Sequence, residues 1–133
     1  MIAVDQVPDE AILYHRVHVN FVKHSGGHLR PNCFSDKKGV GLSTDWDKYS
    51  TAAQTRLRPG PEKAVNYGIV GFNAGAVRHI QQLTVAHSPT EDNDAHTDIF
   101  GLSTDAELLT AQRAELYDAC GRRFLIEPGS PLA

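Results

Sequence analysis

The stretch from Asn66 to Gly101 constrains the fold of this chain more than any other. It opens with an apolar run, Tyr67 to Phe72, that is typical of a buried strand. Three closely spaced glycines follow the start of this run, namely Gly68, Gly71 and Gly75. The same stretch carries three of the seven histidines, His79, His87 and His96. A strand that leads into a glycine-rich bend often holds side chains at the edge of a sheet, so we expect the functional site here.

The flanking segments predict further strands. Residues 11–19 alternate between apolar and polar side chains, which is typical of a strand, and residues 95–102 show a weaker alternation. Short strands are also expected at Cys33-Phe34, at Val40 to Ser43 and at the beginning of the C-terminal segment after Gly121. Lys23 to Lys38 is rich in Gly, Ser, Asn and charged residues and predicts a long loop.

The clearest predicted helix runs from Leu102 to Gly121. Thr104 and Glu107 have the spacing of a capping box, and Gly121 provides the stop. Helical spacing then directs three residues toward the sheet, Leu109, Leu116 and Cys120. Shorter helices are expected after Thr51 and after Asn73, whose side chains can cap free backbone amides. We predict an α+β fold, in which a small, mostly antiparallel sheet of about five strands packs these helices on one face.

Length and composition indicate one globular domain over residues 1–133, with an N-terminal arm at 1–10 and a flexible tail at 128–133. The chain has 133 residues, of which 41% are hydrophobic, enough for one core. A formal charge of −3 without a basic stripe argues against nucleic-acid binding. The sequence contains neither an apolar run of about 18 residues nor the order of a signal peptide. We therefore expect a soluble cytoplasmic protein that does not bind membranes.

Strand periodicity suggests which side chains meet a ligand. Arg16 and His18 lie on one face of the first predicted strand, whereas His15 shares the core face with Val17. The proposed ligand-binding set combines that exposed face with the central stretch and consists of Arg16, His18, Arg78, His79, His87 and His96. This favours a small binding or accessory protein with a polar pocket and an unidentified ligand. Loops or a second copy of the chain would cover this face, which would make a homodimer.

Two enzymatic alternatives stay open. Seven histidines invite a metal site, for which His87 and His96 would need a third ligand from the nearby aspartates Asp92, Asp94 or Asp98. Histidines that cap and hydrogen-bond are the simpler explanation, so we assign no metal ligand. The two cysteines, Cys33 and Cys120, lack a CxxC partner and are interpreted as buried thiols. No cofactor is identified.

Several segments resemble a family of small bacterial proteins without an assigned activity. They are ILYHRVHVNFV near the beginning, GLSTD in the middle, the central stretch YGIVGFNAGAVRHIQQLTVAHSPTEDNDAHTDIFG, and LYDACGRRFLIEP near the end. The resemblance covers nearly the whole chain. It implies one compact unit and brings no activity with it.

A second resemblance concerns LYHRV and VGLSTD, which are similar to two segments of ADP-ribosyl-transferring domains and related NAD-consuming toxins. It implies that Arg16 or His15 together with Ser43 binds NAD, and that Tyr49 stacks on nicotinamide. Such an enzyme also needs a carboxylate that stabilises a positively charged sugar. No strand-borne glutamate stands out for that role, because the capping position explains Glu107.

Overall fold

The computed structural model describes residues 2–35 and 41–132. Within these residues, five strands form one antiparallel sheet, and four α-helices accompany it, which confirms the α+β prediction. The strands are β1 (Ile12–His18), β2 (Leu42–Trp46), β3 (Tyr67–Asn73), β4 (Thr84–His87) and β5 (His96–Phe100). The α-helices are α1 (Ala52–Leu57), α2 (Pro61–Ala64), α3 (Ala74–Arg78) and the long α4 (Ala106–Ala119). Short 3-10 turns follow β1 at η1 (Val19–Phe21), η2 (Lys23–Ser25) and η3 (Pro31–Cys33).

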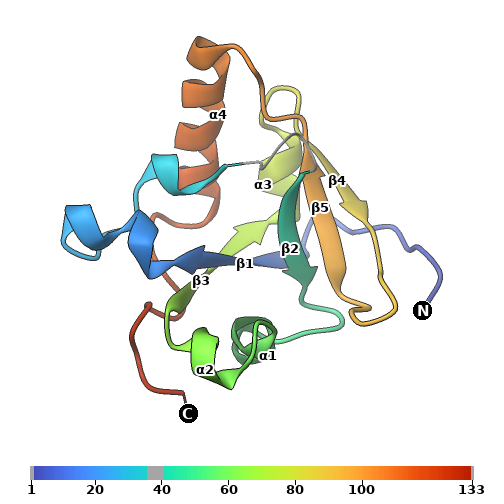
Figure 1. Cartoon of the computed structure of the whole chain (residues 1–133). Coiled ribbons are helices and arrows are strands. Elements are labelled where there is room, and N and C mark those ends of the chain that lie inside the picture. Colours follow the sequence, from blue (N-terminus) through green and yellow to red (C-terminus); the bar gives the residue numbers. More distant parts are fainter. Residues whose placement is uncertain (1, 36–40, 133) are drawn as a thin grey trace.

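The sheet has the strand order β3-β1-β2-β5-β4. β1 pairs with β3 along its whole length, from Ile12 to His18, whereas its described register with β2 covers Leu13 and Tyr14. The β1–β3 ribbon therefore runs across β2, β5 and β4 at a steep angle (Figure 1).

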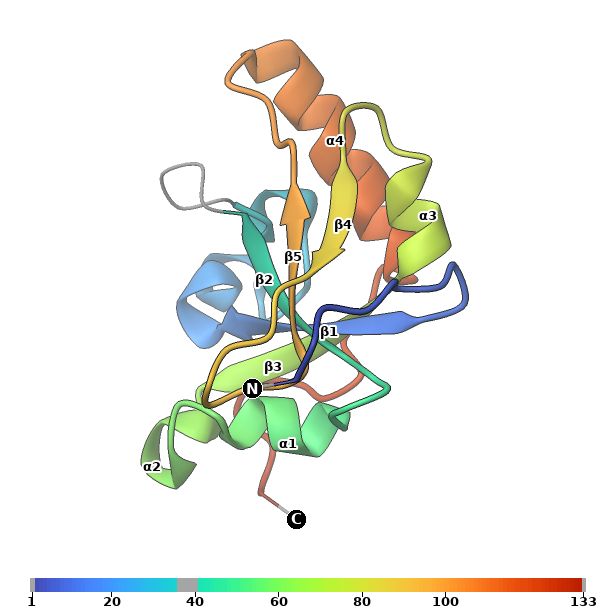
Figure 2. The ribbon, with the colours of Figure 1, turned by 90° about the vertical axis from the view of Figure 1, so that its right-hand side faces the viewer.

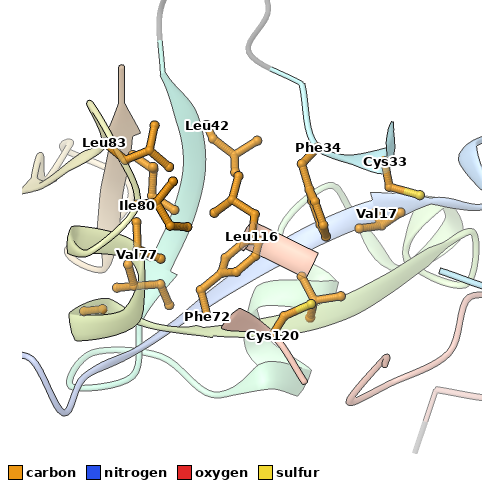
Figure 3. Packing of buried hydrophobic residues seen from close by; sticks show 14 of the residues in the cluster. Val17, Cys33, Phe34, Leu42, Phe72, Val77, Ile80, Leu83, Leu116 and Cys120 are labelled. Carbon is orange, nitrogen blue, oxygen red and sulfur yellow. The ribbon is translucent and has the colours of Figure 1, made fainter. Parts of the chain in front are cut away.

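The core lies between the sheet and the helices α3 and α4. Phe34, Phe72 and Leu116 are fully buried, and Figure 3 shows them meeting near the centre of the cluster. The rings of Phe34 and Phe72 pack edge to face with centroids 5.2 Å apart. α4 contributes Leu116 and Cys120 as predicted, but the third predicted residue, Leu109, is only partly buried.

The buried side of α4 includes a polar side chain, the amide of Gln112. Gln112 is fully buried, and its Nε2 donates hydrogen bonds to the carbonyls of Gln81 and Gly101. Its Oε1 accepts a hydrogen bond from the backbone N–H of Ser103. These bonds satisfy the amide in the core and fix the angle at which the chain enters α4.

The cap of α4 differs from the prediction. Asp105 rather than Thr104 is the N-cap, and its carboxylate accepts from the backbone N–H of Leu108 at 2.9 Å. A carboxylate caps well because it also interacts favourably with the positive end of the helix. A capping box does occur in α1, where Thr51 and Gln54 bond reciprocally. The predicted Asn73 cap of α3 is present as well.

Two of the predicted short strands are wrong. The chain at Cys33 forms the 3-10 turn η3, because Pro31 favours a helical start and removes a ladder donor. The segment after Gly121 reaches the sheet only through an isolated bridge between Ile69 and Ile126 in the described residues. The strand expected from Val40 instead comprises Leu42–Trp46, and residue 40 itself lies outside the described ranges.

Two of the central glycines, Gly68 and Gly71, allow close packing of the C-terminal segment and do not form a loop. Gly68 and Gly71 lie inside β3, where the C-terminal segment passes directly over the strand. A Cβ added at Gly68 would lie 2.6 Å from Cδ of Pro128 and 2.7 Å from the ring of Phe124. The expected glycine-rich bend is thus a strand whose missing side chains make room for residues 124–128.

The sequence predicted that all helices pack on one face of the sheet, but they do not. Figures 1 and 2 show α3 and α4 at one end of the sheet and α1 and α2 at the other. α1 contacts β1 and β3 on the face that carries Arg16, whose Nη1 donates to the carbonyl of Thr55 at 3.1 Å. Among the described residues, we find no helix that is both long and apolar enough to cross a membrane.

The C-terminal segment is fixed by a buried arginine. Arg56 of α1 is 3% exposed, and its guanidinium donates hydrogen bonds to backbone carbonyls of two distant segments. On one side it bonds to the carbonyls of Ala64 and Tyr67, and on the other to those of Ser130 and Pro131. Carbonyl dipoles thereby solvate a charge that is buried away from water.

Replacement of this arginine should destabilise the fold. We expect Arg56→Met to lower the free energy of unfolding by about 2–4 kcal/mol, because several buried carbonyls lose their donor at once. The measurement is urea denaturation followed by circular dichroism. The exposed Arg123 provides a matched control, because Arg123→Met should change the unfolding free energy by less than about 0.5 kcal/mol. Equal effects of both variants would contradict the role of Arg56 in fixing the C-terminal segment.

Candidate functional site

Three adjacent strands present polar side chains on the face opposite the core. β1 contributes Tyr14 and Arg16, and β2 contributes Ser43 and Asp45. Asp45 is the register partner of Tyr14 on one side and of His96 on the other, while Ser43 is paired with Asp98. Because register partners and alternate residues share a face, the pairing brings these six residues together.

Two neighbouring cavities adjoin this polar face and share Arg16 and Ser43. The first, of about 290 Å³, combines polar atoms with the rings of His15 and Phe21 and is lined by His15, Arg16, Phe21, Cys33, Ser35, Gly41, Leu42 and Ser43. The second, of about 110 Å³, is mainly polar and is lined by Tyr14, Arg16, Ser43, Thr44, Asp45, Asn93 and His96. We call the two cavities together the Arg16 groove.

A buried carboxylate forms the floor of the Arg16 groove. Asp45 is 2% exposed and accepts hydrogen bonds from the hydroxyl of Thr55, from Nε of Arg58 and from the amide of Asn93. Burial by itself would raise the pKa of Asp45, but these three hydrogen bonds and the Arg58 charge outweigh it and lower the pKa. Asp45 is therefore ionised at neutral pH and serves to join β2, α1 and the β4–β5 connection.

His96 is oriented by the neighbouring chain. Its Nδ1 lies 3.0 Å from the carbonyl oxygen of Ser88, which can only accept a hydrogen bond, so Nδ1 carries a proton. Its Nε2 points into the groove, 3.4 Å from Oγ of Ser43 and 3.6 Å from a carboxylate oxygen of Asp98. The imidazole thus offers Nε2 for chemistry in the groove.

Arg16 lies between the two cavities and is the cation best placed for an anionic ligand. One of its five N–H groups bonds to Thr55, and in the described part of the chain its guanidinium forms no ion pair. Burial lowers the pKa of Arg16 while the nearby Asp45 charge opposes that change, and an arginine stays charged at neutral pH. Donors therefore remain for a phosphate or carboxylate.

His15 faces the core, as its strand position predicted. Its ring packs near Phe34 and Phe72 with centroids 6.1 Å away in both cases. Burial lowers its pKa to about 4, although a hydrogen bond between Nδ1 and the carbonyl of Ser43 opposes this shift. His15 is therefore neutral near pH 7 and contributes a ring wall rather than a charge to the first cavity.

The six residues of the predicted ligand-binding set are dispersed, and only Arg16 and His96 meet in the groove. His18 caps η1 by accepting from the N–H of Asn20, and its ring packs edge to face on Tyr67. Arg78 forms an ion pair with Asp9 at 2.7 Å and also donates to the carbonyl of Val7. His79 bonds to the carbonyl of Gly75 and lines a separate hollow between α3 and α4.

His87 is buried and uses both ring nitrogens on the backbone. Nδ1 accepts from the N–H of Asp5 at 3.0 Å, and Nε2 donates to the carbonyl of Asp94 at 2.7 Å. The ring of Tyr49 stacks on His87 with an angle of 9° between the planes. Tyr49 is thus engaged away from the groove, so it is not placed to stack on nicotinamide as the resemblance implied.

These contacts also bear on the metal alternative. His87 could ligate an ion only by giving up one of its backbone bonds, and His96 offers a single nitrogen. Among residues 2–35 and 41–132 we find no group of three side chains with the donor atoms and spacing of a metal site. Of the nearby aspartates, Asp98 faces His96 rather than His87.

Sequence reasoning did not assign Asp45 and Asn93 to the site, and it considered Asp98 only as a metal ligand. The signal for Asp98 was present, since alternation over HTDIF places His96 and Asp98 on one face. The neighbours of that pair could not be inferred, because strand order and register are set by contacts between distant segments.

Comparison with protein-family models, with curated proteins and with solved structures found no match to this chain. The relationship to a family of small bacterial proteins therefore stays a prediction. The function has to be argued from the chemistry of the Arg16 groove.

The partly buried imidazole of His15 predicts a specific dependence of stability on pH. Its folded pKa of about 4 lies below the ordinary value of 6.5, so the unfolded chain binds a proton first as the pH falls. The free energy of unfolding should therefore decrease by up to about 1.4 kcal/mol per unit from pH 6.5 down to about 4. His15→Phe should reduce this slope in urea titrations.

His24 is exposed in η2 and serves as the control. His24→Gln should leave the slope unchanged. Asp45 affects only the acidic end of this range, because its pKa is lowered from the ordinary value of 3.8 and its loss of stability begins as the unfolded carboxyl takes up a proton. An identical slope in the wild type and in His15→Phe would contradict the assignment.

Proposed function

We propose that the protein is an NAD-consuming enzyme that breaks the bond between nicotinamide and ribose and transfers the ADP-ribosyl group. The observation that carries this proposal is that Arg16 and Ser43 line one groove, while Asp98, the register partner of Ser43, lies beside it 3.6 Å from His96. The sequence resemblance implied that Arg16 or His15 binds NAD together with Ser43, but it identified no carboxylate that could stabilise the sugar. Asp98 supplies one on the same face.

Arg16 is suited to the pyrophosphate of a dinucleotide. A guanidinium binds phosphate oxygens with paired N–H donors, and this one retains donors after its bond to Thr55. It is also shared by the two cavities, so an anion on Arg16 would have room for one substituent on either side. A ligand with a charged centre and two flanking groups matches this arrangement.

The two cavities differ in character. The first contains aromatic and apolar atoms, with Phe21 half exposed and Leu42 buried in its wall. Planar rings such as nucleobases bind well against aromatic side chains. The second cavity has mostly hydroxyl, amide, carboxylate and imidazole groups, which suit a sugar and a reacting centre.

Asp98 is positioned for the charge that develops during the reaction. When the bond from C1′ to the pyridinium nitrogen breaks, the ribose becomes positively charged, and a nearby carboxylate stabilises that charge. The side chain of Asp98 is only 12% exposed, so little water screens it. The hydroxyl of Ser43, its register partner, can hold the ribose by a hydrogen bond.

Substitutions in the Arg16 groove should lower turnover. With NAD as substrate and nicotinamide release as the readout, we expect Arg16→Met to lower kcat/KM by about 10- to 100-fold through lost phosphate bonds. Asp98→Asn should lower kcat by about 100- to 1,000-fold with a smaller change in KM, because the carboxylate acts mainly in the transition state.

Arg78→Met is the matched control. Arg78 was part of the ligand-binding set predicted from sequence, but it pairs with Asp9 away from the groove and should not affect turnover. Equal losses in Arg16→Met and Arg78→Met would contradict the groove as the site. NAD binding that depends on Arg16 but leads to no nicotinamide release would favour the binding-protein alternative instead.

The homodimer also stays a proposal. It would cover the part of the polar face that α1 leaves open. Light scattering coupled to size-exclusion chromatography would measure the mass directly.

A further inference from the structure

The pair of His96 and Asp98 carries an inference about the second substrate of the proposed reaction. Nε2 of His96 lies near both the hydroxyl of Ser43 and the carboxylate of Asp98. The contacts of His96 to Ser43 at 3.4 Å and to Asp98 at 3.6 Å are long for direct hydrogen bonds. An oxygen atom bound between these groups could contact all three at normal distances.

The proton on His96 is fixed by geometry. The Ser88 carbonyl accepts the Nδ1 proton, and the same two residues are bonded a second time, because the N–H of Ser88 donates to the carbonyl of His96. The imidazole therefore cannot rotate without breaking this contact. In its neutral form it presents an unprotonated Nε2 to the groove, which is the state required of a base.

We propose that His96 is the general base of the transfer step and that the acceptor is a hydroxyl, either water or an alcohol. This inference rests on the proposed cleavage of NAD. As the bond from C1′ to nicotinamide breaks, its electron pair stays on the ring nitrogen and neutral nicotinamide leaves. The acceptor oxygen bonds to C1′, and its proton moves to Nε2 of His96.

Asp98 completes this assignment. The imidazolium that forms on His96 lies beside the Asp98 carboxylate, which stabilises it until the proton passes to solvent. Other groups that face this position are Arg16 and Tyr14 from β1, Asp45 from β2 and Asn93 from the β4–β5 connection. Asp45 is already paired with Arg58 and hydrogen-bonded to Asn93, which leaves His96 as the base.

The test uses the full chain with NAD as substrate and measures nicotinamide release as a function of pH. In the wild type the rate should fall toward acidic pH, as expected for a step that needs a general base. His96→Gln should lower kcat by about 100-fold or more and remove this acidic decline, with little change in KM. Sodium azide, an anionic nucleophile that needs no base, should restore turnover in His96→Gln and yield the azido sugar.

Two matched variants sharpen the result. His79→Gln alters a histidine away from the groove and should keep the wild-type profile. Asp98→Asn should not be rescued by azide, because it lacks the carboxylate that stabilises the sugar. An independent readout is the nitrogen-15 spectrum of the histidines, in which His96, assigned through His96→Gln, should carry its proton on Nδ1.

The outcomes separate the two proposals. If the wild type releases no nicotinamide, the proposed function is wrong and this inference falls with it. If the wild type turns over NAD but His96→Gln keeps the acidic decline, or if His96 carries its proton on Nε2, only the inference is overturned. A covalent ADP-ribosyl adduct on Ser43 would also overturn it, because Ser43 rather than an external hydroxyl would then be the acceptor.

Discussion

The buried carboxylate of Asp45 is the interaction on which the polar side of this protein depends. It draws donors from α1 and from the β4–β5 connection onto β2, and so it joins three segments that the sheet alone would leave independent. A buried ion pair is costly to desolvate, and removal of one partner leaves an uncompensated charge. The position of this network beneath the groove indicates that its contribution is geometric: it keeps the wall that bears His96 in place.

The histidines show how one residue type can serve different physical purposes within a short chain. His18 caps a turn, His87 connects the N-terminal arm to the β4–β5 region, and His15 supplies a neutral ring to the core. Each of these uses satisfies ring nitrogens with backbone groups. His96 differs because its Nε2 faces the polar side chains of Ser43 and Asp98.

The fold class, the long helix and the main strands could be predicted because they follow from local periodicity. β1 and β3 alternate or are continuously apolar, and Asn73 and Thr51 carry their caps in the adjacent sequence. The site could be predicted only in part. Arg16 was recognised from its exposed face, but its partnership with Asp98 depends on the order β1-β2-β5, which is set by pairing between distant segments. The glycines of β3 misled for the same reason, since the segment that packs on them comes more than fifty residues later.

The hydrogen bonds of Arg56 to the C-terminal segment affect the order in which parts of the chain fold during synthesis. Arg56 is separated by 74 residues from Ser130, whose carbonyl completes its shell. Until residue 130 has been synthesised, α1 holds a cation whose final site is unfinished, and that cation is more stable in water. During translation α1 should therefore be fixed in place late, once the C-terminal segment has docked onto Arg56.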